Sequence, residues 1–221
     1  MRELVELTGM VIKSSPVGEY DKRLVILTRE RGRITAFARG AKRPGNSLMG
    51  PSRPFAFGNF KLYEGREAYN LQGAEISQYF EELVMDMEGA CYGQYFLELG
   101  DYYSRENLNG EALLLLIYQS LRALLKPAIP NPLVQRIFEL KAMVLNGEYT
   151  QYPPRPVSES ASYTWEFVVT SPIEKLYTFA VTDEVYEEFC QCVEINKSRY
   201  IDRDFHSLEI LKTLIQYSQT Y

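Results

Sequence analysis

Cysteine and histidine are scarce in this chain of 221 residues, which has three cysteines and one histidine, His206. A sparse, odd number of cysteines argues against a disulfide framework and indicates a reducing compartment. No apolar run is long enough to span a bilayer. Glu3 and Glu6 interrupt the segment in which a signal peptide would need an apolar stretch. We therefore expect a cytoplasmic protein with no membrane partner.

Signatures of catalysis are also missing. The sequence has no P-loop, no G-x-S-x-G motif and no metal-binding cluster of carboxylates. His206 stands before a predicted C-terminal helix without a recognisable partner, and general-base catalysis requires a second group within reach. These absences predict a protein that is not an enzyme and that needs no cofactor.

Positive charge is concentrated in one part of the chain. Residues 1–80 contain 13 basic and 8 acidic residues, whereas residues 81–221 contain 11 basic and 21 acidic residues. From Lys22 to Arg53 nine residues are basic and only Glu30 is acidic. The overall net charge of −5 hides this division. The asymmetry indicates an N-terminal domain that meets a polyanion and a C-terminal part that does not.

Residues 1–80 have the pattern of five short strands. Gly9 lies inside the first strand, where glycine indicates a bulge or a sharp coil, and Gly32 supplies the positive φ that a tight hairpin turn needs. A small closed barrel fits this pattern; the OB-fold is the commonest such design, and an SH3-like barrel is the alternative. We expect the strands within Val5–Lys13, Leu24–Leu27, Ile34–Phe37, Pro54–Tyr63 and Ala68–Gln72.

Residues 81–221 are predicted to form a helical domain, so the fold class is α+β. Asn131 is the expected N-cap of one helix, and Asn146 with Gly147 gives a left-handed C-cap signal. An irregular insert near 148–170 includes a strand-like segment, Tyr163–Val169. We expect helices over Glu82–Tyr103, Glu111–Lys126, Asn131 to Asn146, a short stretch after Ser171, Thr182 to Cys192, and Phe205–Gln216.

The basic residues of the N-terminal domain are the first candidate site. Such a surface neutralises the phosphates of a nucleic acid, whereas the alternative is a solvated charged face without function. Tyr20, in a polar stretch, is the best candidate for stacking against a base. The candidate basic residues are Lys22, Arg23, Arg29, Arg31, Arg33, Arg39, Lys42, Arg43 and Arg53.

Short segments in a distinctive order extend along most of the chain. They are Gly9–Ile12, Gly18–Asp21, Leu27–Gly32, Ala38–Arg43, Ser47, Pro54-Phe55, Leu62–Gly65, Tyr95–Leu99, Arg136–Leu140 and Asn146-Gly147. No single segment is specific. Their order and spacing together resemble the RecO family of bacterial recombinational repair proteins.

The resemblance implies an N-terminal OB-fold that binds single- and double-stranded DNA, followed by a helical domain. It implies strand annealing without catalysis, and loading of a recombinase, together with RecR, onto strands coated with single-strand binding protein. It also implies association with the nucleoid. On this interpretation the protein is a DNA-binding recombination mediator in DNA repair.

One feature departs from the family's pattern. Many members carry two Cys-x-x-Cys pairs soon after the helix that contains Phe-Glu-Leu, whereas residues 148–170 contain no cysteine here. Tetrahedral zinc needs four ligands, and three cysteines with His206 are the most that the chain offers. We therefore expect no metal, and a loop around Pro153–Pro156 in place of the zinc module.

The resemblance further implies that the helical domain binds the acidic, aromatic-ended C-terminal tail of single-strand binding protein. Such a tail needs an apolar pocket rimmed by cations. Arg136 and Lys141, on one predicted helix, are weak candidates, and ordinary helix-surface charge is the alternative.

Two other functions stay open. The acidic C-terminal part and the missing zinc motif are compatible with a protein-interaction adaptor whose DNA binding is weak or lost. An OB-fold is equally compatible with an RNA-binding protein, which would prefer RNA through contacts with 2′-hydroxyl groups.

Overall fold

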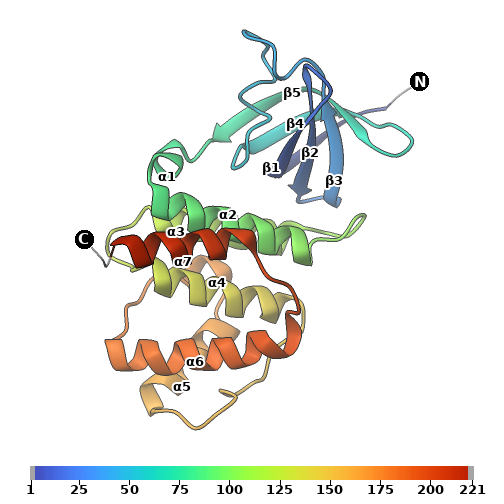
Figure 1. Cartoon of the computed structure of the whole chain (residues 1–221). Helices are drawn as coiled ribbons and strands as arrows, with labels where there is room; N and C mark the ends of the chain where they lie inside the picture. Colours follow the sequence, from blue (N-terminus) through green and yellow to red (C-terminus); the bar gives the residue numbers. More distant parts are fainter. Residues whose placement is uncertain (1–2, 219–221) are drawn as a thin grey trace. The chain divides into compact units, whose positions relative to one another are not determined.

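The computed structural model describes residues 3–218, in which five strands precede the helices (Figure 1). The strands are β1 (Leu4–Val17), β2 (Asp21–Thr28), β3 (Gly32–Ala38), β4 (Phe57–Tyr63) and β5 (Tyr69–Gln78). The helices are α1 (Glu81–Met85), α2 (Met87–Tyr103), α3 (Glu111–Leu124), α4 (Asn131–Leu145), α5 (Glu159–Thr170), α6 (Asp183–Tyr200) and α7 (His206–Ser218), with a 3₁₀ turn η1 at Ile173–Lys175. None of these helices is both long and apolar enough to cross a membrane.

The chain forms two compact units. The barrel unit contains the residues up to Glu81 together with Leu97–Leu114. The helical unit contains Glu82–Phe96 together with the residues from Leu115 onward. The sequence-based division at residue 80 lies one residue from the first of these boundaries, but it did not foresee that residues 97–114 group with the strands.

The five strands close into a barrel in the order β1-β2-β3-β5-β4, which is the OB-fold. The long β1 pairs with β2 along one edge and with β4 along the other, and a parallel contact between β3 and β5 completes the ring. Gly9 pairs with both Thr28 and Gly58, and a Cβ there would lie 2.6 Å from the Leu27 carbonyl oxygen. Glycine therefore permits close backbone approach, while the register shift lies between Val11 and Lys13 instead.

The barrel interior is filled by the alternating apolar residues of its strands. In β3, for example, Ile34 and Ala36 are buried and the residues between them are only half-buried. The loop after β3 adds three more apolar side chains, Ala41, Leu48 and Ala56, to the same core. Its buried apolar side chains therefore hold the loop against the barrel.

The tip of the β2–β3 hairpin is bound by backbone hydrogen bonds to the segment between α2 and α3. The amide of Arg33 donates to the carbonyl of Arg105 (3.0 Å), and the amide of Asn107 donates to the carbonyl of Arg31 (3.1 Å). Gly32 sits between them at φ +61°, and a Cβ there would lie 2.3 Å from the Arg105 carbonyl oxygen. The turn thus needs glycine for its positive φ and also for space.

A pair of glycine variants separates these two requirements. Gly18 has a similar φ of +57°, but a Cβ there would meet nothing within 4 Å. Gly18→Ala should therefore cost about 1 kcal/mol, the strain of a left-handed alanine. Gly32→Ala should cost about 3 kcal/mol, because overpacking adds to the same strain. Urea unfolding monitored by circular dichroism measures the free energy of unfolding of both variants. Equal decreases would show that the Arg105 backbone does not pack closely against Gly32.

The helical unit is built around α4, which packs against α5 and α6. Phe138 of α4 stacks on Phe96 of α2 with ring centroids 4.2 Å apart. The predicted left-handed C-cap is confirmed, since Gly147 has φ +75°. The predicted N-cap is one residue off: Pro130 has extended backbone and its carbonyl starts the helix, so Asn131 is the first helical residue.

The predicted helix Glu82–Tyr103 is divided in two. Asp86 separates α1 from α2 because its carboxylate accepts the amide of Gly89 (3.1 Å) and its carbonyl accepts the amide of Ala90 (2.8 Å). These two bonds satisfy amides at the start of α2.

The prediction of a strand at Tyr163–Val169 was wrong, because these residues lie in α5. Ser158 caps the helix by accepting the amide of Ala161, and residues at helical spacing, among them Trp165 and Val168, are buried. Tertiary packing thus overrides the β-propensity of the segment. The irregular insert is limited to the loop before Ser158, which Trp165 anchors by donating its indole N–H to the carbonyl of Thr150 (3.1 Å).

Candidate nucleic-acid interface

Four predicted cations gather around Tyr20 in the barrel unit. We call Lys22, Lys42, Arg43 and Arg53 the cation cluster. Lys22 lies on β2 beside the β1–β2 turn, and the other three lie on the loop between β3 and β4. The structure records no carboxylate partner for any of the four among the described residues, and all except Lys22 are exposed.

Backbone contacts bring the β3–β4 loop onto the β1–β2 turn. The amide of Lys42 donates to the carbonyl of Tyr20 (2.9 Å), and the amide of Gly40 donates to the Asp21 carboxylate (2.7 Å). The Arg43 guanidinium then lies over the Tyr20 ring, 4.4 Å from its centroid. The ring is 40% exposed. The β1–β2 turn and the β3–β4 loop thereby form one surface, which contains cations and an aromatic ring.

Lys22 shows how close the members of the cation cluster are to one another. The pKa of its ammonium is lowered, first by partial burial and then by the positive charges of Arg53 and Lys42. The charges of Arg53 and Lys42 therefore lie close enough to the Lys22 ammonium to disfavour its charged form. An anion bound here would relieve this repulsion.

The three arginines at the hairpin tip are engaged with acids. Arg29 pairs with Glu30 (3.1 Å), Arg33 pairs with Asp101 (3.5 Å), and Arg31 donates both to Glu64 (2.9 Å) and to the hydroxyl of Tyr69 (2.5 Å). Glu64 and Tyr69 raise the pKa of Arg31. These arginines form a paired group, whereas the cation cluster is unpaired.

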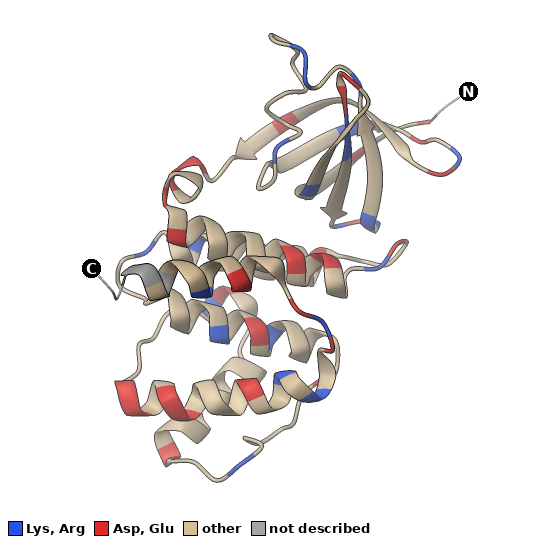
Figure 2. Ribbon diagram, in the orientation of Figure 1, with Lys and Arg blue, Asp and Glu red and all other residues tan. Residues whose placement is uncertain are grey.

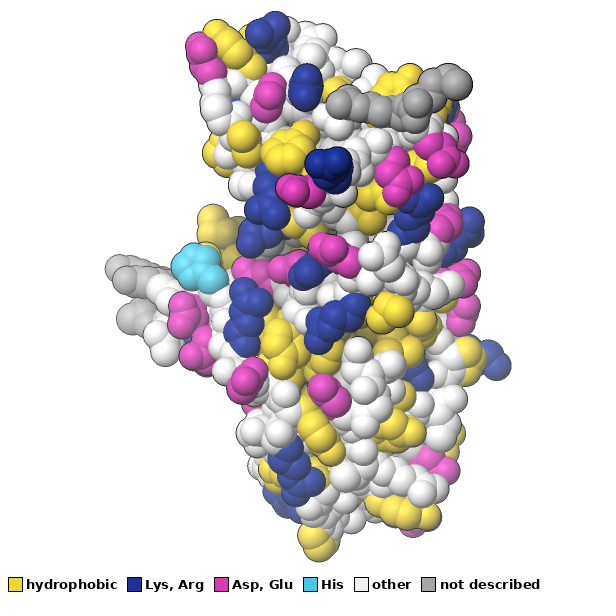
Figure 3. Space-filling model, turned by 90° about the vertical axis from the view of Figure 1, so that its right-hand side faces the viewer, with side chains coloured by type: hydrophobic (Ala, Val, Ile, Leu, Met, Phe, Trp, Pro, Cys, Tyr) yellow, Lys and Arg dark blue, Asp and Glu magenta, His cyan; other side chains and the backbone are white. Residues whose placement is uncertain are grey.

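The remaining two predicted cations, Arg23 and Arg39, are exposed and have no recorded carboxylate partner within residues 3–218. Figure 2 shows Lys and Arg on the strands and loops of the barrel, and Asp and Glu recurring along α2 and α6. On the face in Figure 3 the cations are interspersed with acids and do not form a continuous band.

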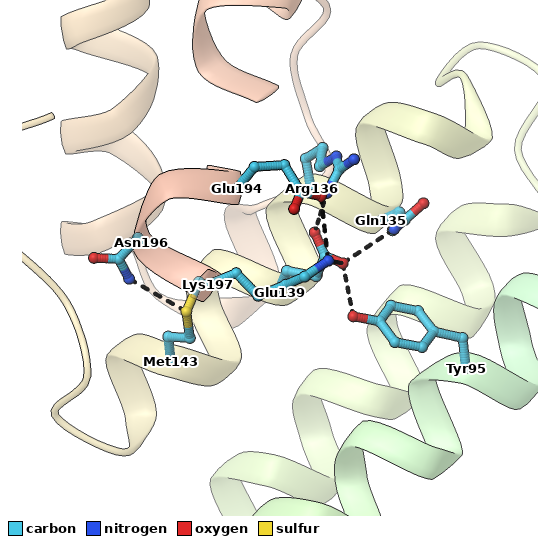
Figure 4. A network of polar contacts seen from close by, with 8 residues as sticks. All are labelled: Tyr95, Gln135, Arg136, Glu139, Met143, Glu194, Asn196 and Lys197. Carbon is cyan, nitrogen blue, oxygen red and sulfur yellow. Dashed lines mark hydrogen bonds and ion pairs between the residues drawn. The ribbon is translucent and has the colours of Figure 1, made fainter. Parts of the chain in front are cut away.

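In the helical unit, Arg136 belongs to a polar network around Glu139 (Figure 4). Glu139 is fully buried and accepts hydrogen bonds from Tyr95 (2.6 Å), Gln135 (3.0 Å), Arg136 (2.8 Å) and Lys197 (3.0 Å). Burial alone would raise the pKa of the Glu139 carboxyl, but the two cations and the hydrogen bonds outweigh burial and hold it below its usual value. Arg136 also pairs with Glu194.

Lys141 does not join this network. It is buried, and its ammonium donates to three carbonyl oxygens at the end of α5, those of Val168 (3.2 Å), Val169 (3.0 Å) and Ser171 (2.7 Å). Burial lowers the pKa of Lys141. The Lys141 ammonium thus satisfies carbonyl groups at the C-terminus of α5. Of the two residues predicted to form a partner site, Arg136 lines the open pocket and Lys141 does not, so the prediction that they share one site is corrected.

Sequence reasoning missed two features of these sites. Lys42 and Arg53 lie in an irregular loop, where no strand register predicts the neighbours of a side chain. Only the structure shows that they lie near Lys22. Two of the acids that pair with the hairpin tip, Asp101 and Glu64, are distant in sequence, and no local pattern identifies them as partners. As for metals, residues 3–218 contain no group of three His, Cys, Asp or Glu side chains arranged to hold an ion.

A closed barrel of five strands in this order, with cations beside an exposed tyrosine, defines the class of OB-fold proteins. The family model described as recombination protein O, N terminal, matches residues 1–80. A DNA repair protein RecO of Alkaliphilus metalliredigens is 31% identical over 169 residues, which cover 74% of this chain and 67% of the relative. The chain belongs to the RecO family.

Other relatives extend the similarity over the helical unit. A DNA repair protein RecO of Acetivibrio thermocellus is 22% identical over 243 residues, covering 95% of this chain and 97% of the relative. One of Clostridium perfringens is 25% identical over 240 residues, covering 95% and 98%. The similarity therefore includes both units.

Proposed function

We propose that this protein acts in DNA repair as a recombination mediator. Its barrel unit binds single- and double-stranded DNA, promotes the annealing of complementary strands and, with RecR, helps to load a recombinase onto strands coated with single-strand binding protein. Membership of the RecO family supports the DNA repair role. The observation that carries DNA binding is the cation cluster around Tyr20, whose positive charges have no acidic partner among residues 3–218.

The geometry suggests how annealing proceeds. Two strands repel each other through their phosphates, so a surface that neutralises phosphates allows them to approach. The exposed Tyr20 ring offers a face on which a base can stack, which holds a single strand without reading its sequence. Base pairing then supplies the driving force, and no acid or base group of the protein is needed.

We extend the proposal to the helical unit, which receives the acidic, aromatic-ended tail of single-strand binding protein. A pocket of about 600 Å³ there is lined by the cations Arg136, Lys197, Arg203 and Lys212. Apolar side chains, among them Leu208, lie in the same lining. The same lining contains the acids Glu194, Asp204 and Glu209, which the four cations outnumber by one. This positive excess beside apolar side chains favours a tail that is acidic and ends in an aromatic residue.

Salt dependence tests the DNA-binding proposal. If the four members of the cation cluster each neutralise one phosphate of a single strand, log K should fall against log salt with a slope of about −2.8. Affinity should then decrease about 50-fold between about 50 and 200 mM salt. Fluorescence anisotropy with a labelled oligonucleotide measures this slope.

The same assay separates the alternatives. An adaptor that has lost DNA binding would show no salt-sensitive signal, and an RNA-binding protein would release labelled DNA when unlabelled RNA of the same sequence is added. Annealing of complementary strands precoated with single-strand binding protein tests the tail proposal. If coating abolishes the annealing seen with bare strands, the tail contact is absent although DNA binding is intact.

A further inference from the structure

A groove in the helical unit lies between α5 and the segment that leads from η1 into α6. Its volume is about 610 Å³. Tyr163 and Phe167 of α5 form one wall, and Phe179 and Val181 form the other, with Val185 of α6 at one end. It shares no lining residue with the pocket beside Arg136.

Three aromatic side chains, one of them exposed, line the groove. Tyr163 is 67% exposed, although it is a large side chain in the middle of a helix whose opposite face is buried. Its ring lies 6.4 Å from that of Phe167, which in turn meets Phe179 edge-on at 5.1 Å. Phe167 and Phe179 are half-buried, so the three rings form a partly accessible row, which marks an interaction surface more often than isolated apolar residues do.

The wall opposite α5 has free backbone groups. Residues 178–182 belong to neither helix nor strand, and Thr182 is extended with φ −72° and ψ 163°. Within the described part of the chain, the amides of Phe179, Ala180 and Val181 make no recorded backbone hydrogen bond. An extended peptide placed beside this segment pairs with such groups as an added strand.

The charge around the groove has one sign. Glu159 lies in the lining, Asp183 and Glu184 form the first turn of α6 directly after Thr182, and no Lys or Arg lines the groove within residues 3–218. The acidic tail of the proposed function would be repelled here, whereas a basic segment would be attracted.

We propose that this groove binds a short extended segment of another protein, with apolar side chains at alternate positions and Lys or Arg beside them. The apolar side chains enter between the two walls of the groove, the peptide backbone pairs with residues 179–181, and the flanking cations face Glu159 and the first turn of α6. The helical unit then has two peptide sites of opposite charge preference.

Selection of random 12-residue peptides displayed on phage, with the full chain as bait, tests the proposal. The enriched peptides should be positively charged and apolar at alternate positions. With the best enriched peptide as a fluorescent probe, Tyr163→Ala and Glu159→Lys should each weaken binding about tenfold. Glu187→Lys, the same charge change at an exposed position of α6 outside the groove, should leave the affinity unchanged.

The binding mode is tested on the peptide itself. Successive amides of a strand point to opposite edges, and only one edge pairs with the groove. N-methylation of the odd-numbered or of the even-numbered peptide amides should therefore abolish binding for one set and be tolerated for the other. The proposal is overturned if no basic peptide is enriched, if enriched peptides are acidic, or if both variants bind them normally. A dimer in light scattering that Tyr163→Ala dissociates would instead assign the groove to a second copy of this chain.

Discussion

Reversing the charges of Lys42 and Arg53 together should weaken the binding of single-stranded DNA about 100-fold at low salt. Each lost charge-assisted contact is worth about 1.5 kcal/mol, and tenfold in affinity corresponds to about 1.4 kcal/mol. Both side chains are exposed, and the pKa of Lys22 records their proximity to that residue. The variant Lys42→Glu with Arg53→Glu should also reduce the steepness of the salt dependence by about 1.4, the contribution of two phosphates of a single strand.

The matched control makes the same change of charge elsewhere on the barrel. Lys13 and Arg66 are exposed, have no recorded ion pair and lie outside the candidate set. Lys13→Glu with Arg66→Glu should lower affinity only slightly, through the long-range field. If both double variants lose affinity equally, binding depends on the overall charge of the barrel and the cation cluster is not the site. Thermal unfolding of each variant confirms that the barrel is intact.

Removing the carboxylate of Glu139 should be the most destabilising single change in the helical unit. Glu139→Ala leaves Arg136 and Lys197 without their buried partner, although their side chains are only 16% and 17% exposed. Unpaired charges at such sites cost about 3–5 kcal/mol. Glu194→Ala is the matched control, since Glu194 contacts the same two cations but is 47% exposed, and it should cost less than about 1 kcal/mol.

The same residue predicts how stability depends on pH. The pKa of Glu139 in the folded protein lies below the ordinary value of 4.5. Its contribution to the free energy of unfolding is therefore complete above about pH 4.5 and is lost as the pH falls through the lower folded value. Urea unfolding between pH 7 and pH 3 should show this decrease for the natural chain and a shallower one for Glu139→Ala. Equal slopes would mean that Glu139 is not the group that titrates.

Local patterns in the sequence predicted the barrel well. Strand alternation and the turn glycine at Gly32 define β2 and β3, because each depends only on residues a few positions apart. Gly147 likewise predicted where α4 ends. Each of these signals comes from the backbone conformation that one residue type favours.

Features that depend on tertiary contacts were not predictable in the same way. Tyr163–Val169 has strong β-propensity, yet the burial of Trp165 and Val168 places it in a helix. Lys141 looked like a surface cation, and only the position of the α5 carboxyl end shows that it is buried. The candidate site had the same limit: composition identified the basic residues, but not which of them have acidic partners.

The contact between the hairpin tip and the segment after α2 has a consequence for synthesis of the chain. The last strand ends at Gln78, yet the amide of Gly110 is the donor that satisfies the carbonyl of Arg29. The ribosome must therefore add about thirty further residues before the barrel can complete its hydrogen bonds, which takes about 2–6 seconds at ordinary elongation rates. During that interval the hairpin tip, in the most basic part of the chain, lacks its hydrogen-bond partners between α2 and α3. The order of translation thus makes completion of the barrel wait for the segment between α2 and α3.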